Sequence, residues 1–119
     1  MLLLTSTLTS IGSYGMGMSS SGDAYSIQGS GTYGAVNKPG VSDDVIVSVD
    51  PATGTVMSEV GNVTGYSDVY GLAGWLGSIF AFDASGDVIL IDPVSGSATV
   101  IKTTNHSWWG AGVGTVVPT

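Results

Sequence analysis

The sequence predicts an all-β fold, because its composition disfavours helices and its apolar residues occur in short runs separated by turn residues. The chain has 119 residues, of which 19 are glycine, and Lys and Arg together number only two. Glycine and β-branched residues are poor helix formers, whereas Glu, Lys and Arg are good ones. Runs such as Val45–Val49 and Ile79–Phe82 have the length and the β-branched or aromatic character of strands. We therefore expect strands joined by turns and almost no helix.

A recurring motif gives the expected strands their order. The sequence Asp-Pro-Ala-Thr-Gly at residues 50–54 returns as Asp-Pro-Val-Ser-Gly at residues 92–96, which is 42 residues later. Each copy lies between two apolar or alternating runs, so that strand, turn and strand is the natural interpretation. Proline presets φ for the first corner of such a turn, aspartate accepts backbone N–H bonds, and glycine supplies a left-handed residue. This period is typical of one blade of a β-propeller.

A second recurring element predicts the innermost strands. An aromatic residue followed by glycine and small or apolar residues occurs three times, starting at Tyr14, Tyr70 and Trp109. Small residues let backbones approach closely, which an inner strand needs where propeller blades crowd around a central axis. Two further runs, at 24–27 and 79–82, fall between an inner strand and an Asp-Pro strand. Each blade then has four strands.

Together these patterns predict a β-propeller fragment of about two four-stranded antiparallel blades within a single unit, residues 1–119. The first blade spans 13–61 and includes an irregular insert at 29–43, and the second spans 69–103. Partial strands of flanking blades are expected at 2–11, as the outer strand of a preceding blade, and at 108–117, as the inner strand of a following one. The expected strands are 13–18, 24–28, 45–50 and 55–61 in the first blade, and 69–74, 78–83, 87–92 and 97–103 in the second.

The residues around the Asp-Pro motif resemble a known repeat. The run Asp-Val-Ile-Val-Ser-Val-Asp-Pro-Ala-Thr-Gly-Thr-Val at 44–56 and its shorter echo at 87–100 are similar to the YVTN-type β-propeller repeat of bacterial and archaeal surface and secreted proteins. The resemblance covers residues 44–61 and 69–103. It implies a propeller fold, but that superfamily includes binding proteins, structural surface proteins and a few enzymes, and a fold does not fix a function.

Two blades on their own would leave sheet edges and apolar faces in water, which is costly. Propellers normally have about four to eight blades around a channel. We therefore expect further blades in a longer protein or self-assembly of identical subunits, and an isolated chain that is oligomeric or aggregates. The outer strand at 2–11 and the inner strand at 108–117 do not sum to a whole blade, which favours the longer protein.

The charge balance excludes two classes of partner. The only cations are Lys38 and Lys102, against eight aspartates and Glu59, and the formal net charge is −7. Nucleic acids and anionic membrane surfaces need clustered Lys or Arg, so we expect neither as a partner. No apolar run approaches the ~20 residues that span a bilayer, so we expect no membrane insertion. The acidic, lysine-poor and Thr/Ser/Gly-rich composition favours an extracellular or cell-surface location.

Catalytic and metal chemistry have few candidates. A hydrolase triad would have to use His106, the only histidine, but no Gly-x-Ser-x-Gly elbow accompanies it and a polar turn is the simpler interpretation. The absence of cysteine excludes thiol nucleophiles, thiolate metal sites and disulfides. We expect no enzyme and no required cofactor. Calcium is the one candidate ion: Asp83 and Asp87 supply oxygens at alternating positions, Asp43 and Asp44 could add carboxylates, but the bidentate glutamate of a calcium loop is missing.

Aromatic side chains in the loops are candidate ligand contacts. Such side chains at one end of a propeller can stack on sugar rings or anchor a protein partner. Tyr70 and Trp109 recur with the inner strands and are interpreted as packing between blades. Trp75 and Trp108 do not recur, and together with Tyr66 they are the predicted ligand-binding residues.

The sequence thus predicts a non-catalytic recognition or structural scaffold module of a secreted or cell-surface protein, which presents its loops to a protein partner. The alternative is a carbohydrate-binding propeller lectin that uses the loop tryptophans. A propeller lyase or lactonase-like enzyme comes third. Asn62 and Asn105 begin N-glycosylation acceptor motifs, which matter only in a host that modifies them.

Overall fold

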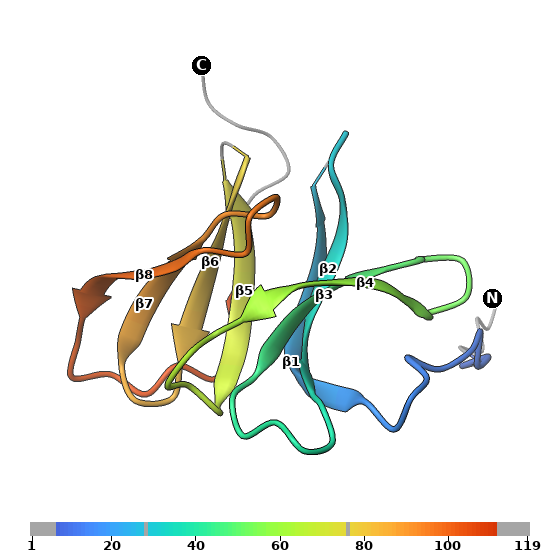
Figure 1. The fold of residues 1–119 in the computed structure, drawn as a ribbon, viewed down its shortest axis with the longest axis horizontal. Coiled ribbons are helices and arrows are strands. Elements are labelled where there is room, and N and C mark those ends of the chain that lie inside the picture. Colours follow the sequence, from blue (N-terminus) through green and yellow to red (C-terminus); the bar gives the residue numbers. More distant parts are fainter. Residues whose placement is uncertain (1–6, 28, 76, 112–119) are drawn as a thin grey trace, which may run out of the picture.

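The computed structural model describes residues 7–27, 29–75 and 77–111. Within these ranges the chain forms two four-stranded antiparallel sheets and no helix, which confirms the all-β expectation (Figure 1). Because the described residues contain no helix, none is long and apolar enough to cross a membrane. Sheet 1 consists of β1 (Ser19–Ile27), β2 (Gly31–Asn37), β3 (Val45–Val49) and β4 (Val56–Asn62), and sheet 2 of β5 (Val69–Trp75), β6 (Ser78–Asp83), β7 (Asp87–Ile91) and β8 (Ala98–Thr103), each in this spatial order.

The two Asp-Pro turns adopt the same structure, as the motif predicts. The N–H of Gly54 bonds to the carbonyl of Asp50 at 2.7 Å, and the N–H of Gly96 bonds to that of Asp92 at 2.9 Å. Both glycines have left-handed backbones, with φ of 74° and 75°. The Asp92 carboxylate also accepts the N–H of Val94 at 2.8 Å, and the Asp50 carboxylate likewise accepts the N–H of Ala52 at 2.9 Å. These bonds fix the hairpins β3–β4 and β7–β8, whose strands begin and end within one residue of the predicted positions.

The first half of sheet 1 differs from the prediction. Residues 13–18 form no strand, because a turn bonds the N–H of Met18 to the carbonyl of Gly15 at 3.0 Å and three successive residues, 15–17, have positive φ. The first strand of the sheet is instead β1, which absorbs the predicted second strand at 24–28. The second strand is β2, which lies inside the predicted irregular insert at 29–43. The reason is a tight hairpin at Gly29, whose φ of 77° and the bond from Ser30 N–H to the Ile27 carbonyl reverse the chain.

The predicted flanking strands are not formed in the described residues. Residues 7–11 and 108–111 have no strand structure, and the rest of the ranges 2–11 and 108–117 lies outside the described residues. A strand requires a hydrogen-bonded neighbour, and neither segment has a third sheet beside it to pair with.

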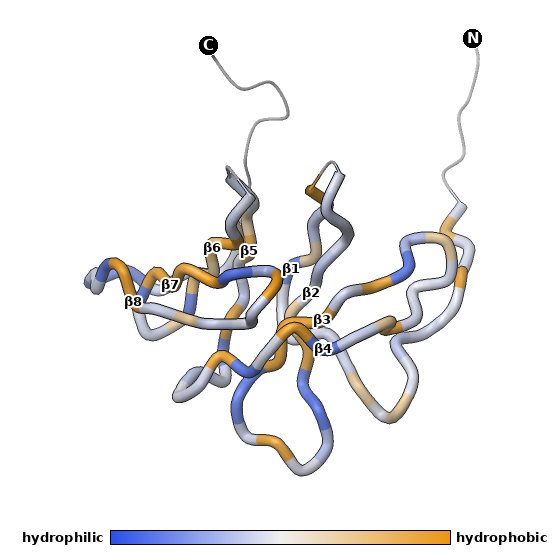
Figure 2. The backbone as a smooth tube through the Cα atoms, turned by 45° about the horizontal axis from the view of Figure 1, so that its top comes forward, coloured by the Kyte–Doolittle hydropathy of each residue, from blue (hydrophilic) through white to orange (hydrophobic). Residues whose placement is uncertain are grey.

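The two sheets pack face to face, with their first strands, β1 and β5, next to each other (Figure 1). Their shared core contains side chains from both sheets, and hydrophobic segments recur along β3 and β6–β8 (Figure 2). The backbones of β1 and β5 approach closely at Gly22, since a Cβ placed there would lie 2.5 Å from the Cα of Tyr70. The buried members of this core are Tyr33, Ala35, Ile46, Val63, Val69, Leu72, Ile79, Ala81, Ile89 and Ile91.

The opposite faces of the two sheets are covered unequally. Sheet 1 turns four buried valines away from sheet 2, and we call this set, Val36, Val45, Val47 and Val49, the valine face. It is covered by Tyr14 and Met18 of residues 7–18, which we call the strap, and by Val41 and Val56. The corresponding side of sheet 2, which we call the open face, carries Phe80, Phe82, Val88 and Leu90, none of which is fully buried.

Candidate functional site

One end of the two sheets is acidic. Asp44, Asp68 and Asp87 lie at the starts of β3, β5 and β7, and Asp83 lies at the end of β6. Alternate strands of an antiparallel sheet begin at the same end, so these carboxylates gather there. Elsewhere on sheet 1, an ion pair joins Lys38, which follows β2, to Glu59 of β4, with Nζ and Oε1 2.9 Å apart. The acidic end thus brings together four carboxylates.

Asp44 is the buried centre of the acidic end, with only 1% of its surface exposed. Its Oδ2 accepts a bond from the Ser21 hydroxyl of β1 at 2.6 Å and another from the Val69 N–H of β5 at 2.8 Å, so one carboxylate ties the two sheets together. Its Oδ1 is buried and has no hydrogen-bond partner among the described residues. Its backbone holds the loop between the sheets, through bonds to Val63 and Tyr66 at 2.8 Å each.

Burial raises the pKa of the Asp44 carboxyl above its usual range. The bonds from Ser21 and Val69 favour the ionised form and act in the opposite direction, while the nearby carboxylates of Asp68 and Asp83 add to the rise. Asp44 is therefore an ionisable group at the contact between sheets, where a change of charge alters how well they pack.

The predicted calcium residues have other partners. The Asp83 carboxylate is buried and accepts the N–H of Ser85 at 2.9 Å and that of Asp68 at 3.3 Å, so it caps the turn between β6 and β7. The Asp87 carboxylate accepts the hydroxyl of Tyr66. In the described part of the chain no group of three or more His, Cys, Asp or Glu side chains is placed to hold a metal ion. Calcium stays a prediction without structural support.

The bond from Tyr66 to Asp87 should be visible in a titration. Hydrogen bonding to the carboxylate, together with burial, raises the pKa of Tyr66 to about 12. We expect Asp87→Asn to lower this pKa, because the amide neither carries charge nor holds the phenol proton as strongly. The measurement is the absorbance change of tyrosinate at alkaline pH, with Tyr66→Phe identifying which transition belongs to this residue. An unchanged titration in Asp87→Asn would contradict the bond.

Of the three predicted ligand-binding aromatics, Trp75 lies apart from Tyr66 and Trp108. Tyr66 lies at the acidic end, in the loop between the sheets. Trp108 packs edge-on against Phe82 at a centroid distance of 5.3 Å and donates its indole N–H to the Gly86 carbonyl at 3.3 Å. Trp75 ends β5 at the opposite end of sheet 2, with 39% of its surface exposed. Tyr66 and Trp108 therefore bond to adjacent residues of the β6–β7 turn, Asp87 and Gly86, and Trp75 lies apart from both.

The recurring aromatics Tyr70 and Trp109 stack on each other, with ring centroids 5.3 Å apart and an angle of 12° between the planes. The same C-terminal segment is held by a bond from the Ala111 N–H to Asp23 Oδ2 at 2.9 Å. Residues 109–111 therefore lie beside the inner strands. The ring of His106 meets Trp108 edge-on, at a centroid distance of 5.7 Å.

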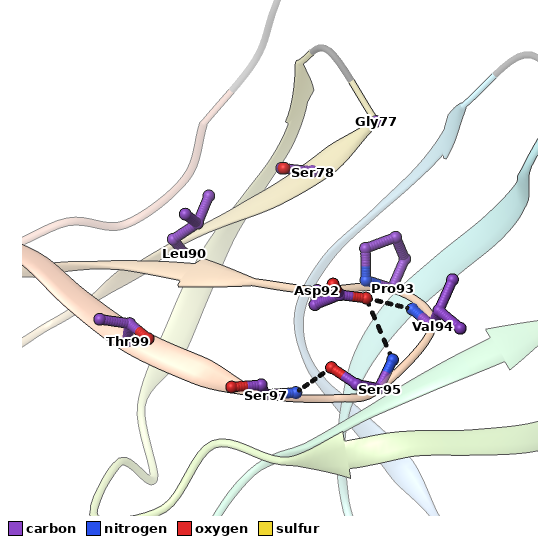
Figure 3. Close-up of a pocket in the computed structure, with 9 residues that line it drawn as sticks. All are labelled: Gly77, Ser78, Leu90, Asp92, Pro93, Val94, Ser95, Ser97 and Thr99. Atoms are coloured by element: carbon purple, nitrogen blue, oxygen red, sulfur yellow. Dashed lines mark hydrogen bonds between the residues drawn. The ribbon is translucent and has the colours of Figure 1, made fainter.

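A shallow hollow of about 480 Å³ lies beside the β7–β8 turn (Figure 3). Leu90 and Thr99 form its floor, Ser78 lies at one side, and the turn from Asp92 to Ser97 forms the other. The polar side chains there bond mainly within the turn: the Asp92 carboxylate takes two backbone N–H groups and Ser95 Oγ takes one. Sequence reasoning missed this hollow, because its residues come from two separate stretches of the chain, 77–78 and 90–99.

Comparison of the chain with protein-family models, with curated proteins and with solved structures found no match.

Proposed function

We propose that the chain is a non-catalytic scaffold: a β-propeller portion of a secreted or cell-surface protein, whose loops and outer strands contact a protein partner. The location rests on the acidic, lysine-poor composition. The architecture rests on contacts that recur from one unit to the next.

The recurrence appears at both the inner and the outer strands. On the inner side, a Cβ at Gly22 would lie 2.5 Å from Tyr70 of the next sheet, and a Cβ at Gly71 would lie 2.8 Å from Gly110 of the C-terminal segment. On the outer side, Gly61 of β4 meets the Asp-Pro turn of sheet 2, and Gly12 of the strap meets that of sheet 1. The strap, sheet 1, sheet 2 and the C-terminal segment are thus related to one another by similar steps. Blades around a propeller axis are arranged in this way. This recurrence is the observation that carries the proposal.

The outer strands suit contact with another protein. All six residues of β8 are exposed, including the apolar Val100 and Ile101, and Met57 of β4 is 63% exposed. Both strands are sheet edges, with backbone groups that can pair with an added strand. A surface of this kind favours protein recognition over a small polar ligand. The lectin alternative has no comparable support, since Trp75 lies at the opposite end of sheet 2 from Trp108 and Tyr66.

The test is the mass and shape of the purified chain. Two sheets fall short of the about four to eight that close a propeller, so we expect reversible, concentration-dependent association. Sedimentation equilibrium gives the mass, and electron microscopy of the associated species should show a ring of sheets around a channel. The proposal would be contradicted if the natural chain and the Gly12→Ala variant described below both fold cooperatively and stay monomeric at every concentration.

A further inference from the structure

The contact between the two sheets is a template for a second contact of the same kind. Sheet 1 meets sheet 2 through Tyr33, Ala35 and Ile46. When the ladder of β2 and β3 is aligned with that of β6 and β7, these positions correspond to Phe80, Phe82 and Val88 of sheet 2. These three residues make up most of the open face. In the same way, Ile89 and Ile91, which sheet 2 presents to sheet 1, match Val47 and Val49 of the valine face. Each sheet therefore has one face of each type, and only one pair of faces meets within the chain.

The two unmatched faces complement each other in size. The open face carries large side chains, and the valine face carries small ones, with Gly34 between its valines. Tyr14 of the strap lies over this glycine, its hydroxyl 3.8 Å from where a Cβ would be. The strap thus places an aromatic ring where a docked sheet would place Phe80 or Phe82. On the two faces the central strands β2, β3, β6 and β7 carry no charge, and the charges lie on the outer strands, where Glu59 is opposite Val47 and Lys102 is opposite Val88. An uncharged centre matters because each copy carries a net charge of −7 and the copies repel elsewhere.

We infer that the open face of sheet 2 docks onto the valine face of sheet 1 in a second copy of this chain, and that the strap is a removable cover over that site. The inference rests on the proposed function, because it extends the same step from sheet to sheet. A head-to-tail contact of this kind can continue until a ring closes.

The strap is held weakly enough to be displaced. Within the described residues, one hydrogen bond joins it to sheet 1, from the Val56 N–H to the Tyr14 carbonyl at 3.2 Å. It contributes no strand to the sheet, and its apolar side chains Leu8, Ile11 and Met16 are between 62% and 102% exposed. Gly12 rests against the Thr53 carbonyl, in the place that β4 of a preceding sheet would take. A docking copy brings its own outer strand to this place, so the strap must leave.

The strap can be dislodged by one methyl group. A Cβ at Gly12 would overlap the Thr53 carbonyl oxygen, and this residue has a φ of 155° that side chains rarely adopt, so Gly12→Ala should release the strap. We expect Gly12→Ala to lower the dissociation constant for self-association by about tenfold or more, measured by sedimentation velocity. Adding Leu90→Glu on the open face should return the variant to a monomer. The matched control is Gly15→Asn, because Gly15 has open space around it and asparagine tolerates its φ of 84°.

Each outcome has a distinct meaning. If Gly12→Ala associates no more tightly than the natural chain, or if association persists with Leu90→Glu, the docking inference is wrong although the scaffold proposal stands. If neither the natural chain nor Gly12→Ala associates at any concentration, the scaffold proposal fails as well. Circular dichroism checks that each variant is folded. Should Gly12→Ala unfold, Tyr14→Ser provides the same test, because it uncovers Gly34 without changing the backbone.

Discussion

Replacing Gly22 with alanine should lower the free energy of unfolding by about 3 kcal/mol, the upper end of the usual cost of overpacking a core. The new Cβ would lie 2.5 Å from both the Cα of Tyr70 and the carbonyl oxygen of Val69. Both atoms belong to the backbone of β5, which cannot turn aside as a flexible side chain can. The sheets would have to separate at their inner strands, and the contacts of their shared core would be lost with them.

Urea unfolding followed by tryptophan fluorescence measures this loss, and Gly34→Ala is the matched control. Gly34 is also a strand glycine of sheet 1, but a Cβ there would be 3.8 Å from its nearest neighbours, which is ordinary contact. Both substitutions replace a strand glycine with alanine, so their effects on the intrinsic conformational preference of the backbone are the same. An equal effect of the two would show that backbone preference, rather than the approach of β1 to β5, sets the cost.

The sequence predicted the parts of this fold that depend on local chemistry. The Asp-Pro turns and the four strands of sheet 2 follow from turn residues and apolar runs that act within a few positions of each other. The first half of sheet 1 was mispredicted for a local reason as well. Gly29 and its neighbours were interpreted as an irregular loop, although the same residue types make the tight hairpin between β1 and β2.

The candidate site depended on long-range contacts, which the sequence pattern does not contain. Ser21 and Val69 are 48 positions apart, and nothing in either segment indicates that both bond to Asp44. Asp44 was noted only as a candidate carboxylate for calcium, since an acidic residue before a strand usually lies in solvent. Burial of this carboxylate follows from the way sheet 1 meets sheet 2. The predicted aromatics were separated for the same reason, because strand direction places Trp75 and Trp108 at opposite ends of sheet 2.

Stability should depend on pH through Asp44. Because its pKa is raised in the folded state, folding favours the protonated carboxyl. This contribution to stability is fully present below the unfolded-state pKa and is lost as the pH rises through the folded-state pKa. Asp44→Asn keeps the shape and an acceptor oxygen but cannot ionise. The stability of this variant relative to the natural chain should therefore increase as the pH rises across that window.

Asp44→Ala separates the charge from the hydrogen bonds. Alanine leaves the buried Val69 N–H and the Ser21 hydroxyl without their acceptor, at a cost of about 1–3 kcal/mol for the orphaned amide at any pH. Urea unfolding at a series of pH values distinguishes the two effects, with Asp43→Asn as the control for removal of a neighbouring, less buried charge. If Asp44→Asn and Asp43→Asn show the same pH dependence, the buried bridge has no special effect. If only Asp44→Asn differs, a single carboxylate between β1 and β5 makes the contact between the two sheets sensitive to pH.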